Sequence, residues 1–441
     1  MKLTRIALCA LLALFTLSAA AEDLVLQQVV LVSRHGVRSP TDIKPPLAQL
    51  AADPWPKWEV GPGMLTPHGA QAATLMGSYY RAAFASEGLL APDGCPRKDD
   101  LFVWSDVEER TRASAQAMLD GMYPGCGLKP ATQPDLEADD PLFHPTTGGV
   151  CKLDGPTART AILGRTGGDL DALLTAYAEP FARLQSVLKC CAPALCKQGR
   201  DCTLQQIPTA ITPEGRIQGP LPIASALTEV FLLEYAGGLP VEQVAWGRAD
   251  EPALLDLSQL HDLYYDITQR TFYPAQRYGS NLLDQVVSTL RGRTTGRRAP
   301  LAKAPAASKV VMLLGHDTNI ANLGGLLNAD WLLAGYQRNA TPPGGALAFH
   351  LYRGKATGRY FVRLFYYAQS PQQLRELAKL DVSRPPSSSE IAIPACVAAG
   401  ARAGAGMACP WTTFERLATG AIDRACVGAG KPQKSTGPKM R

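Results

Sequence analysis

Two apolar runs, one near the start and one in the last third of the chain, have the character of strands buried on both faces of a sheet. Residues 24–32 read LVLQQVVLV, and residues 310–314 read VVMLL. Runs of this kind are typical of parallel strands that are covered on both sides. The carboxyl ends of parallel strands meet at one edge of an open α/β sheet, so the polar residues after each run are expected to lie together. The sequence therefore predicts an α/β fold with its site at that edge.

Nitrogen-rich side chains follow the first run, where residues 34–41 read RHGVRSPT. An arginine fork can bind two phosphate oxygens at once, so Arg34 and Arg38 are candidate clamps for a tetrahedral dianion. Neutral imidazole is a competent nucleophile, and nearby arginines lower the pKa of His35 by disfavouring imidazolium. Taken alone, so short a motif more often marks a solvated basic turn at a strand end.

Two further polar stretches follow expected strands. Residues 315–319 read GHDTN, in which His316 is a candidate phosphate donor and Asp317 a candidate general acid for the leaving alcohol. Residues 106–112 read DVEERTR and follow a strand expected at 101–105. Charged residues at a helix start usually form a solvated face, so this stretch gains weight only beside the other two.

These stretches and their order resemble the histidine acid phosphatases, the secreted branch of the histidine phosphatase superfamily. The resemblance covers most of the mature chain and extends to bacterial phytases and glucose-1-phosphatases. It implies an α/β fold, with a mixed sheet flanked by helices and a second, mainly helical domain. It implies His35 and Asp317 as the catalytic residues. The substrate-binding residues that it implies are Arg34, Arg38, Thr41, Asp106, Arg110, Glu229, His316 and Thr318.

The implied reaction is two-step phosphoryl transfer with no cofactor and no metal. His35 attacks phosphorus to give a phosphohistidine while protonated Asp317 gives its proton to the departing alkoxide. Water then cleaves the intermediate, with Asp317 as base. The groups that neutralise the phosphate oxygens are Arg34, Arg38, Arg110 and His316. Because Asp317 must be protonated in the first step, an acidic pH optimum is expected.

Glu229 and His261, both expected on helices, each have an alternative interpretation. A lone glutamate on a helix, such as Glu229, is more often solvated than bound to substrate. His261 is also available to a site, but a satisfied structural histidine is the favoured interpretation.

The expected substrate is a small phosphomonoester. The GHDTN stretch and the TPPGG turn at residues 341–345 favour phytate. Asp42, where some bacterial phytases carry a lysine, and Ala226, small at a position that is often larger, leave glucose-1-phosphatase or broad acid phosphatase activity open. An alternative of another class is an exported protein that binds phosphate esters without turnover. Such a protein would lack His35 or Asp317, and both are present.

The first 21 residues predict a secretory signal peptide, with Lys2 and Arg5, an apolar stretch at 6–17 and small residues before the cleavage site. Of the 11 cysteines, Cys9 lies in this segment, which leaves ten. An even number in an exported chain argues for disulfides and a periplasmic or secreted location. A zinc site is the weaker alternative, because paired Cys-x-x-Cys units are lacking. The family resemblance implies the pairs Cys95–Cys126, Cys151–Cys426 and Cys396–Cys409, and Cys202 with Cys191 or a neighbour. The surplus cysteines at 190–196 are candidates for a fifth, local bridge.

The formal charge of +5 falls to +3 when Lys2 and Arg5 leave with the signal peptide. This balance is too small to indicate a nucleic-acid partner and suits a polyanionic small substrate. Runs after the signal peptide are too short or too polar to span a bilayer, so no membrane partner is expected, and we expect a monomer.

A mature chain of about 420 residues predicts two domains. We assign residues 22–150 and 299–430 to a discontinuous α/β catalytic domain, 151–298 to a mainly helical domain, and 431–441 to a disordered tail. Helices are expected at 66–85, with Thr66 as N-cap, and at 169–188, 223–235 and 318–327; strands at 346–352 and 360–367; and a solvated linker at 291–308.

Overall fold

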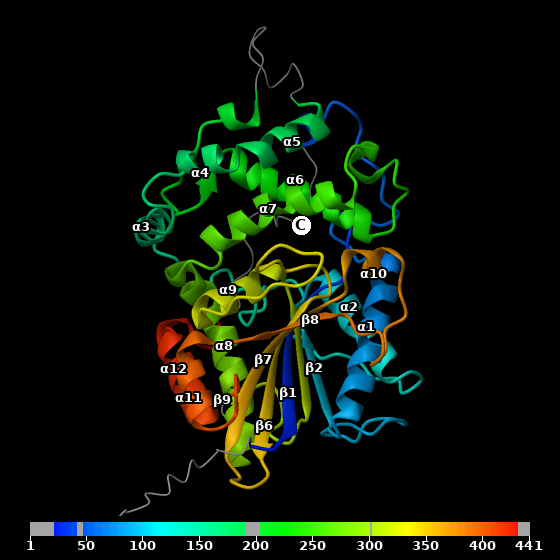
Figure 1. Cartoon of the computed structure of the whole chain (residues 1–441), viewed down its shortest axis with the longest axis vertical. Helices are drawn as coiled ribbons and strands as arrows, with labels where there is room; N and C mark the ends of the chain where they lie inside the picture. The colour runs from blue at the N-terminus through cyan, green and yellow to red at the C-terminus, as the bar shows by residue number, and fades with distance from the viewer. Residues whose placement is uncertain (1–21, 42–46, 191–202, 300–301, 431–441) are drawn as a thin grey trace, which may run out of the picture.

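The computed structural model describes residues 22–41, 47–190, 203–299 and 302–430 (Figure 1). The predicted signal peptide, the predicted tail at 431–441, Asp42, and the cysteines at positions 191, 196 and 202 lie outside the described residues.

A mixed seven-stranded sheet forms the centre of the lower half of the molecule in Figure 1. The strand order is β2-β5-β1-β6-β7-β8, and the short β9 also pairs with β7. β2, β5 and β1 run parallel, whereas the β1–β6, β6–β7 and β7–β8 pairs are antiparallel. The strands are β1 (Leu24–Arg34), β2 (Leu101–Ser105), β5 (Val310–Gly315), β6 (Ala346–Gly354), β7 (Tyr360–Ala368), β8 (Ser387–Ile391) and β9 (Cys409–Pro410).

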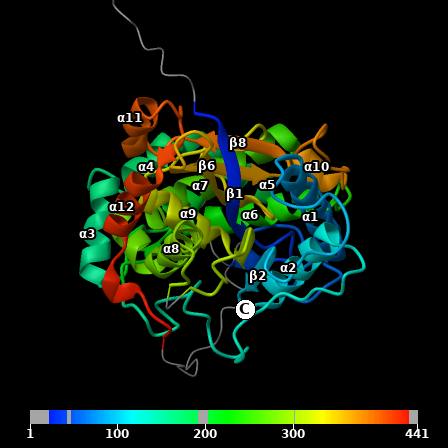
Figure 2. The same ribbon diagram turned by 90° about the horizontal axis from the view of Figure 1, so that it is seen from below.

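The two predicted apolar runs are β1 and β5, and their side chains alternate between two cores, one on each face of the sheet. Val30 and Val32 face the core formed with α8 (Phe272–Thr295), α9 (Asp317–Leu327) and α12 (Trp411–Ala421). Val29 and Leu31 face the core formed with α1 (Pro67–Ser86) and α2 (Glu109–Met122). Figure 2 shows the two helix groups on opposite sides of β1. Burial on both faces explains why these strands are apolar without alternation.

Helix α1 confirms the prediction for residues 66–85. Thr66 is its N-cap, and the Oγ1 atom accepts a hydrogen bond from the backbone N–H of Gly69 at 2.9 Å. Pro67 occupies the first turn, where its missing N–H costs nothing. The predicted late strands are also confirmed as the antiparallel pair β6 and β7.

A group of helices lies above the carboxyl edge of the sheet in Figure 1. It comprises α3 (Gly155–Arg165), α4 (Asp171–Ala176), α5 (Ala178–Leu188), α6 (Pro220–Ala236) and α7 (Glu251–Thr268), with a small hairpin of β3 (Ala210–Ile211) and β4 (Ile217–Gln218). Residues 169–188 were predicted as one helix, but α4 ends at Ala176. Pro180 explains the break, because its ring cannot tolerate the carbonyl four residues earlier in a continuous helix.

Helix α8 extends to Thr295, so the prediction of a linker from residue 291 is wrong for its first residues. Its buried side chains, among them Leu283 and Val287, belong to the core on the sheet. Helix α8 therefore packs with the sheet, although the division proposed from the sequence groups it with the helical segment.

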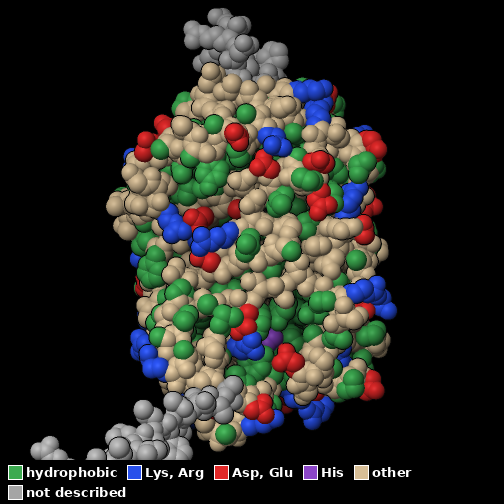
Figure 3. Space-filling view, in the orientation of Figure 1, with side chains coloured by type: hydrophobic (Ala, Val, Ile, Leu, Met, Phe, Trp, Pro, Cys, Tyr) green, Lys and Arg blue, Asp and Glu red, His purple; other side chains and the backbone are tan. Residues whose placement is uncertain are grey.

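The remaining elements include α10 (Pro371–Arg375), α11 (Pro394–Arg402) and 3-10 helices at Leu47–Gln49, Leu204–Gln206, Val244–Gly247 and Arg424–Cys426. Disulfides join Cys95 to Cys126, Cys151 to Cys426 and Cys396 to Cys409, as expected. Cys190 is also disulfide-bonded. Basic and acidic side chains are interspersed over the face seen in Figure 3. Among the described residues, the structure has no helix both long and apolar enough to cross a membrane.

Candidate active site

The carboxyl ends of three parallel strands bring the predicted stretches together. Arg34 at the end of β1 is in register with Gly315 at the end of β5, and Ser105 of β2 pairs with the preceding residue of β5. The backbone N–H of His35 donates to the carbonyl of Gly315 at 3.1 Å, and that of Asp106 donates to β5 at 2.9 Å. These backbone bonds fix the positions of the side chains that follow each strand.

His35 is buried among cationic groups. Its ring centroid lies 5.7 Å from that of His316. Burial and the charges of three nearby arginines lower the pKa of His35, so the ring is neutral. Nδ1 lies 2.8 Å from the carbonyl of Gly36, and because a carbonyl only accepts, Nδ1 carries the proton. The unprotonated nitrogen is therefore Nε2, which has the lone pair of a nucleophile.

Arg34 is held by three partners on other elements. Its Nη1 donates to the carbonyl of Thr341 at 2.6 Å. Its Nη2 contacts Glu229 Oε1 on α6 and lies 3.0 Å from Asp317 Oδ2. Burial alone would lower the pKa of Arg34. The pKa is nevertheless raised, because the two carboxylates stabilise the guanidinium cation. Glu229 is thus buried and paired with Arg34 rather than solvated.

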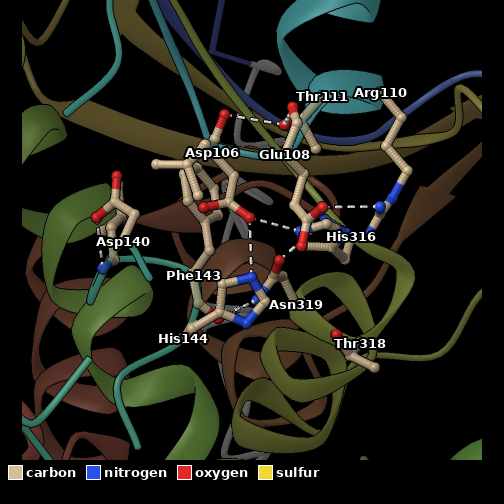
Figure 4. Close-up of polar contacts among 12 residues, drawn as sticks. Asp106, Glu108, Arg110, Thr111, Asp140, Phe143, His144, His316, Thr318 and Asn319 are labelled. Atoms are coloured by element: carbon tan, nitrogen blue, oxygen red, sulfur yellow. Dashed lines mark hydrogen bonds and ion pairs between the residues drawn. The ribbon is translucent and has the colours of Figure 1, made fainter. Parts of the chain in front are cut away.

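Asp317 is the first residue of α9 and is largely buried. Its Oδ1 accepts the backbone N–H of Thr318 at 2.7 Å. Burial opposes ionisation, but the charge of Arg34 holds the pKa of Asp317 below its ordinary value, so the free protein carries a carboxylate here. The side chain of Thr318 lies apart from the imidazole rings of His144 and His316 in Figure 4. The structure therefore does not place Thr318 in contact with these rings.

Arg38 lies in the loop after β1, and Arg110 lies in the first turn of α2. Burial lowers the pKa of Arg38 to about 10, which leaves it a cation at neutral and acidic pH. Its Nη1 donates to the carbonyl of Ser39 at 3.0 Å, and Nη1 of Arg110 pairs with Glu108 Oε2 at 3.0 Å. The Nε atoms of both arginines are buried and have no hydrogen-bond partner in the part of the chain that the structure describes. These donors are suited to the oxygens of a bound anion.

A cavity of about 250 Å³ opens between the helices and the end of the sheet. Its lining includes Arg38, Thr41, Ala226, Glu229, His261 and Asp317. Thr41 and Ala226 are thus pocket residues, whereas Asp42 lies outside the described residues. His261 Nδ1 lies 3.0 Å from the Ser225 hydroxyl, so this histidine is both bonded within the fold and at the cavity.

Asp106 joins two imidazole rings. Its Oδ2 lies 2.6 Å from His316 Nε2 and 2.8 Å from His144 Nε2 (Figure 4). Burial alone would raise the pKa of Asp106, but the charges and hydrogen bonds of the two histidines hold this pKa below its ordinary value. Although burial opposes the shift, the Asp106 carboxylate raises the pKa of His144 to about 9. Burial lowers the pKa of His316. Asp106 therefore orients the His316 ring.

Two residues of this site were missed by sequence reasoning. His144 lies in a turn without periodicity, 38 residues after Asp106. Tyr265 on α7 lines the same cavity as Asp317, and burial together with the charge of that carboxylate raises the pKa of the Tyr265 hydroxyl. Neither belongs to a local motif, so no pattern in the sequence marked them.

A neutral histidine at the carboxyl edge of a mixed sheet, among arginines and beside a carboxyl group, defines an enzyme that handles phosphate esters. The chain belongs to the histidine phosphatase superfamily (branch 2), whose family model matches residues 25–367. It is accordingly a phosphomonoester hydrolase.

Individual relatives cover most of the chain. Phytase AppA of Escherichia coli (strain K12) is 35% identical over 383 residues, which are 85% of this chain and 88% of that protein. Glucose-1-phosphatase of Providencia rettgeri is 28% identical over 409 residues, 91% of this chain and 93% of that protein. The structure of Hafnia alvei phytase in complex with tartrate superposes with a TM-score of 0.84 at 35% identity, covering 92% of this chain and 99% of that one.

Proposed function

We propose that this protein hydrolyses phytate through a phosphohistidine at His35. The observation that carries the proposal is the state of the His35 ring, which is neutral, protonated on Nδ1 by its bond to the Gly36 carbonyl, and therefore nucleophilic at Nε2. Three arginines around it supply the charge that a divalent metal supplies in other phosphoryl-transfer sites, so the reaction proceeds without a metal.

In the first step, Nε2 of His35 forms a bond to phosphorus as the bond to the ester oxygen breaks. The leaving oxygen takes the proton of Asp317. In the free protein Arg34 favours the carboxylate form of Asp317. A phosphate dianion bound to Arg34 competes for that guanidinium and adds negative charge beside Asp317, which favours the protonated form.

In the second step, water attacks the phosphohistidine and Asp317 takes a proton from it. Nε2 leaves with its electron pair, and inorganic phosphate and free His35 are restored. Arg38 and Arg110 hold the equatorial oxygens through both steps. His316 donates its Nε2–H to Asp106, so it donates to a third oxygen from Nδ1 only as the imidazolium, the form that a bound phosphate dianion favours.

Support for phytate comes from the turn behind the site. The Thr341 carbonyl accepts from Arg34, and the backbone N–H of Gly344 donates to the carbonyl of His35 at 2.8 Å. The turn that favoured phytate in the sequence thus contacts both residues. The phytase relatives are also more similar, at 35% against 28% identity for the glucose-1-phosphatase.

Glucose-1-phosphatase activity is the second candidate, favoured by the small Ala226 in the cavity wall and by the long match to that relative. We also propose that the protein is exported to the periplasm or the medium and that it is a monomer. We propose Thr41 and Glu229 as substrate contacts. The three disulfides support export, and the cavity lining supports the two substrate contacts. The division into a discontinuous α/β domain and a helical domain stays a prediction.

The test is phosphate release from phytate and glucose 1-phosphate at acidic pH with EDTA, for wild type and His35→Ala. We expect faster release from phytate, unaffected by EDTA and abolished in the variant. Preference for glucose 1-phosphate would favour the second candidate. Failure to hydrolyse either ester or an aryl phosphate would contradict both and favour a binding protein without turnover.

A further inference from the structure

Asp106, His144 and His316 form a compact cluster that the proposed reaction uses only in part. One ligand atom from each residue lies within 4.8 Å of the others. Both imidazole Nε2 atoms point to the same carboxylate oxygen, Asp106 Oδ2, as Figure 4 shows. The three residues come from the end of β2, a turn before α3, and the start of α9.

The cluster is enclosed on one side and open on the other. Asp106 is fully buried, and the His316 side chain is 8% exposed, whereas the His144 side chain is 32% exposed. The second oxygen of Asp106, Oδ1, is buried without a hydrogen-bond partner among the described residues. A buried carboxylate oxygen left unpaired is costly and is one sign of a missing ion. Solvent reaches the cluster past His144.

The donor set has a defined preference. Two imidazole nitrogens and one carboxylate oxygen match the three protein ligands of many open zinc sites, and imidazole also suits Cu²⁺. Ligand atoms around tetrahedral zinc lie about 3.4 Å apart when the bonds are about 2.1 Å long. The present separations of 2.6 and 2.8 Å must therefore open slightly, and His144 can move because it lies in a partly exposed turn.

We propose that Asp106, His144 and His316 form an inhibitory site for a divalent transition-metal cation, with Zn²⁺ as the matching ion. The fourth position faces solvent. A cation on His316 Nε2 replaces the hydrogen bond by which Asp106 orients the ring, so His316 no longer serves the substrate phosphate. Metal binding rests on the cluster geometry alone, whereas the inhibition also rests on the proposed function.

The binding test uses the full mature protein after EDTA treatment and removal of the chelator. Zn²⁺ is titrated by calorimetry, and Co²⁺ binding is followed by its visible absorption. We compare wild type with His144→Asn, which removes one ligand but can still donate to Asp106. His68→Asn is the matched control, because its ring bonds to the Leu374 carbonyl on α10, away from the cluster. We expect one Zn²⁺ per wild-type and control chain and at least tenfold weaker binding in His144→Asn.

The inhibition test uses p-nitrophenyl phosphate, because phytate itself chelates Zn²⁺. We expect Zn²⁺ to inhibit wild type and His68→Asn, and at least tenfold more Zn²⁺ to be needed for His144→Asn. Equal binding by all three proteins, or none at millimolar Zn²⁺, would overturn the site. Binding that leaves hydrolysis unchanged would overturn its inhibitory role. A protein that binds Zn²⁺ but hydrolyses no ester would contradict the proposed function and leave the metal site supported by the titration.

Discussion

Arg34 Nη2 lies 3.0 Å from Asp317 Oδ2, in an ion pair in which the arginine side chain is 1% exposed and the aspartate side chain 12%. The cation that is placed to hold the substrate phosphate therefore also controls the protonation of the candidate acid. In the free protein the pair favours the carboxylate. When the substrate phosphate binds Arg34, the Asp317 carboxylate loses part of this stabilisation. Asp317 can then hold the proton that the leaving group needs.

Asp317→Asn tests this role through the leaving group. We expect the rate on phytate to fall by about 100-fold to 1,000-fold, because its alkoxide needs a proton. The rate on p-nitrophenyl phosphate should fall by less than about tenfold, because p-nitrophenolate leaves without one. Steady-state kcat/KM on both substrates is the measurement, because it does not include the second step that both substrates share, and the exposed Asp99→Asn is the control. Equal losses on both substrates would argue that Asp317 only positions Arg34.

Tyr265→Phe tests whether the Tyr265 hydroxyl bonds to the Asp317 carboxylate, which lines the same cavity. The hydroxyl favours the carboxylate form, so its loss should raise the pKa of Asp317. The reaction needs protonated Asp317, so the alkaline limb of kcat/KM should move to higher pH, by about one pH unit for a bond to a charged group.

The pH profile is recorded with EDTA present. Tyr264→Phe is the matched control, since this tyrosine is the preceding residue of α7 and also lines the cavity. An alkaline limb that stays in place in Tyr265→Phe, or moves equally in both variants, would contradict the assignment.

Glu234 on α6 predicts a pH dependence of stability that is separate from catalysis. Burial raises the pKa of Glu234 to about 8, although its Oε2 accepts the backbone N–H of Ala245 at 2.8 Å. The folded protein therefore holds a proton that the unfolded chain releases above its ordinary pKa of 4.5. The stability that this proton contributes is complete below pH 4.5 and is lost as the pH rises to about 8.

Glu234→Gln cannot ionise, so it should be more stable than wild type at pH 8, by on the order of 2 kcal/mol, with the difference shrinking towards pH 5. Urea unfolding at both pH values, with disulfides intact, measures the free energy of unfolding. The exposed Glu242→Gln should match wild type throughout. A Gln variant that is less stable at pH 8 would show that Glu234 is ionised in the fold.

The parts of the site that were predicted well from the sequence are the residues that directly follow an apolar strand. His35 and His316 each follow an apolar run, and the rule that parallel strands share an edge was enough to bring them together. Pairing of β1 with β5, in register at Arg34 and Gly315, confirms that step. The disulfide pairs, by contrast, came from family resemblance, since spacing alone allows many connectivities.

The parts that were missed depend on contacts between distant segments. His144 reaches Asp106 from a turn with no repeating pattern, and Tyr265 reaches Asp317 from another layer of the molecule. The end of α8 was missed for another reason. Its arginines and threonines suggested a solvated linker, yet Leu290 is buried against the sheet, and packing decided the helix length.

The most direct test of the central claim is to trap the covalent intermediate. Protein mixed with ³²P-labelled substrate is quenched in alkaline denaturant, which preserves phosphohistidine, and the labelled peptide is mapped. We predict label on His35 in wild type, more of it in Asp317→Asn if that variant slows the second step, and none in His35→Ala. Label on another residue, or turnover by wild type with no trapped label and with activity retained in His35→Ala, would contradict the account.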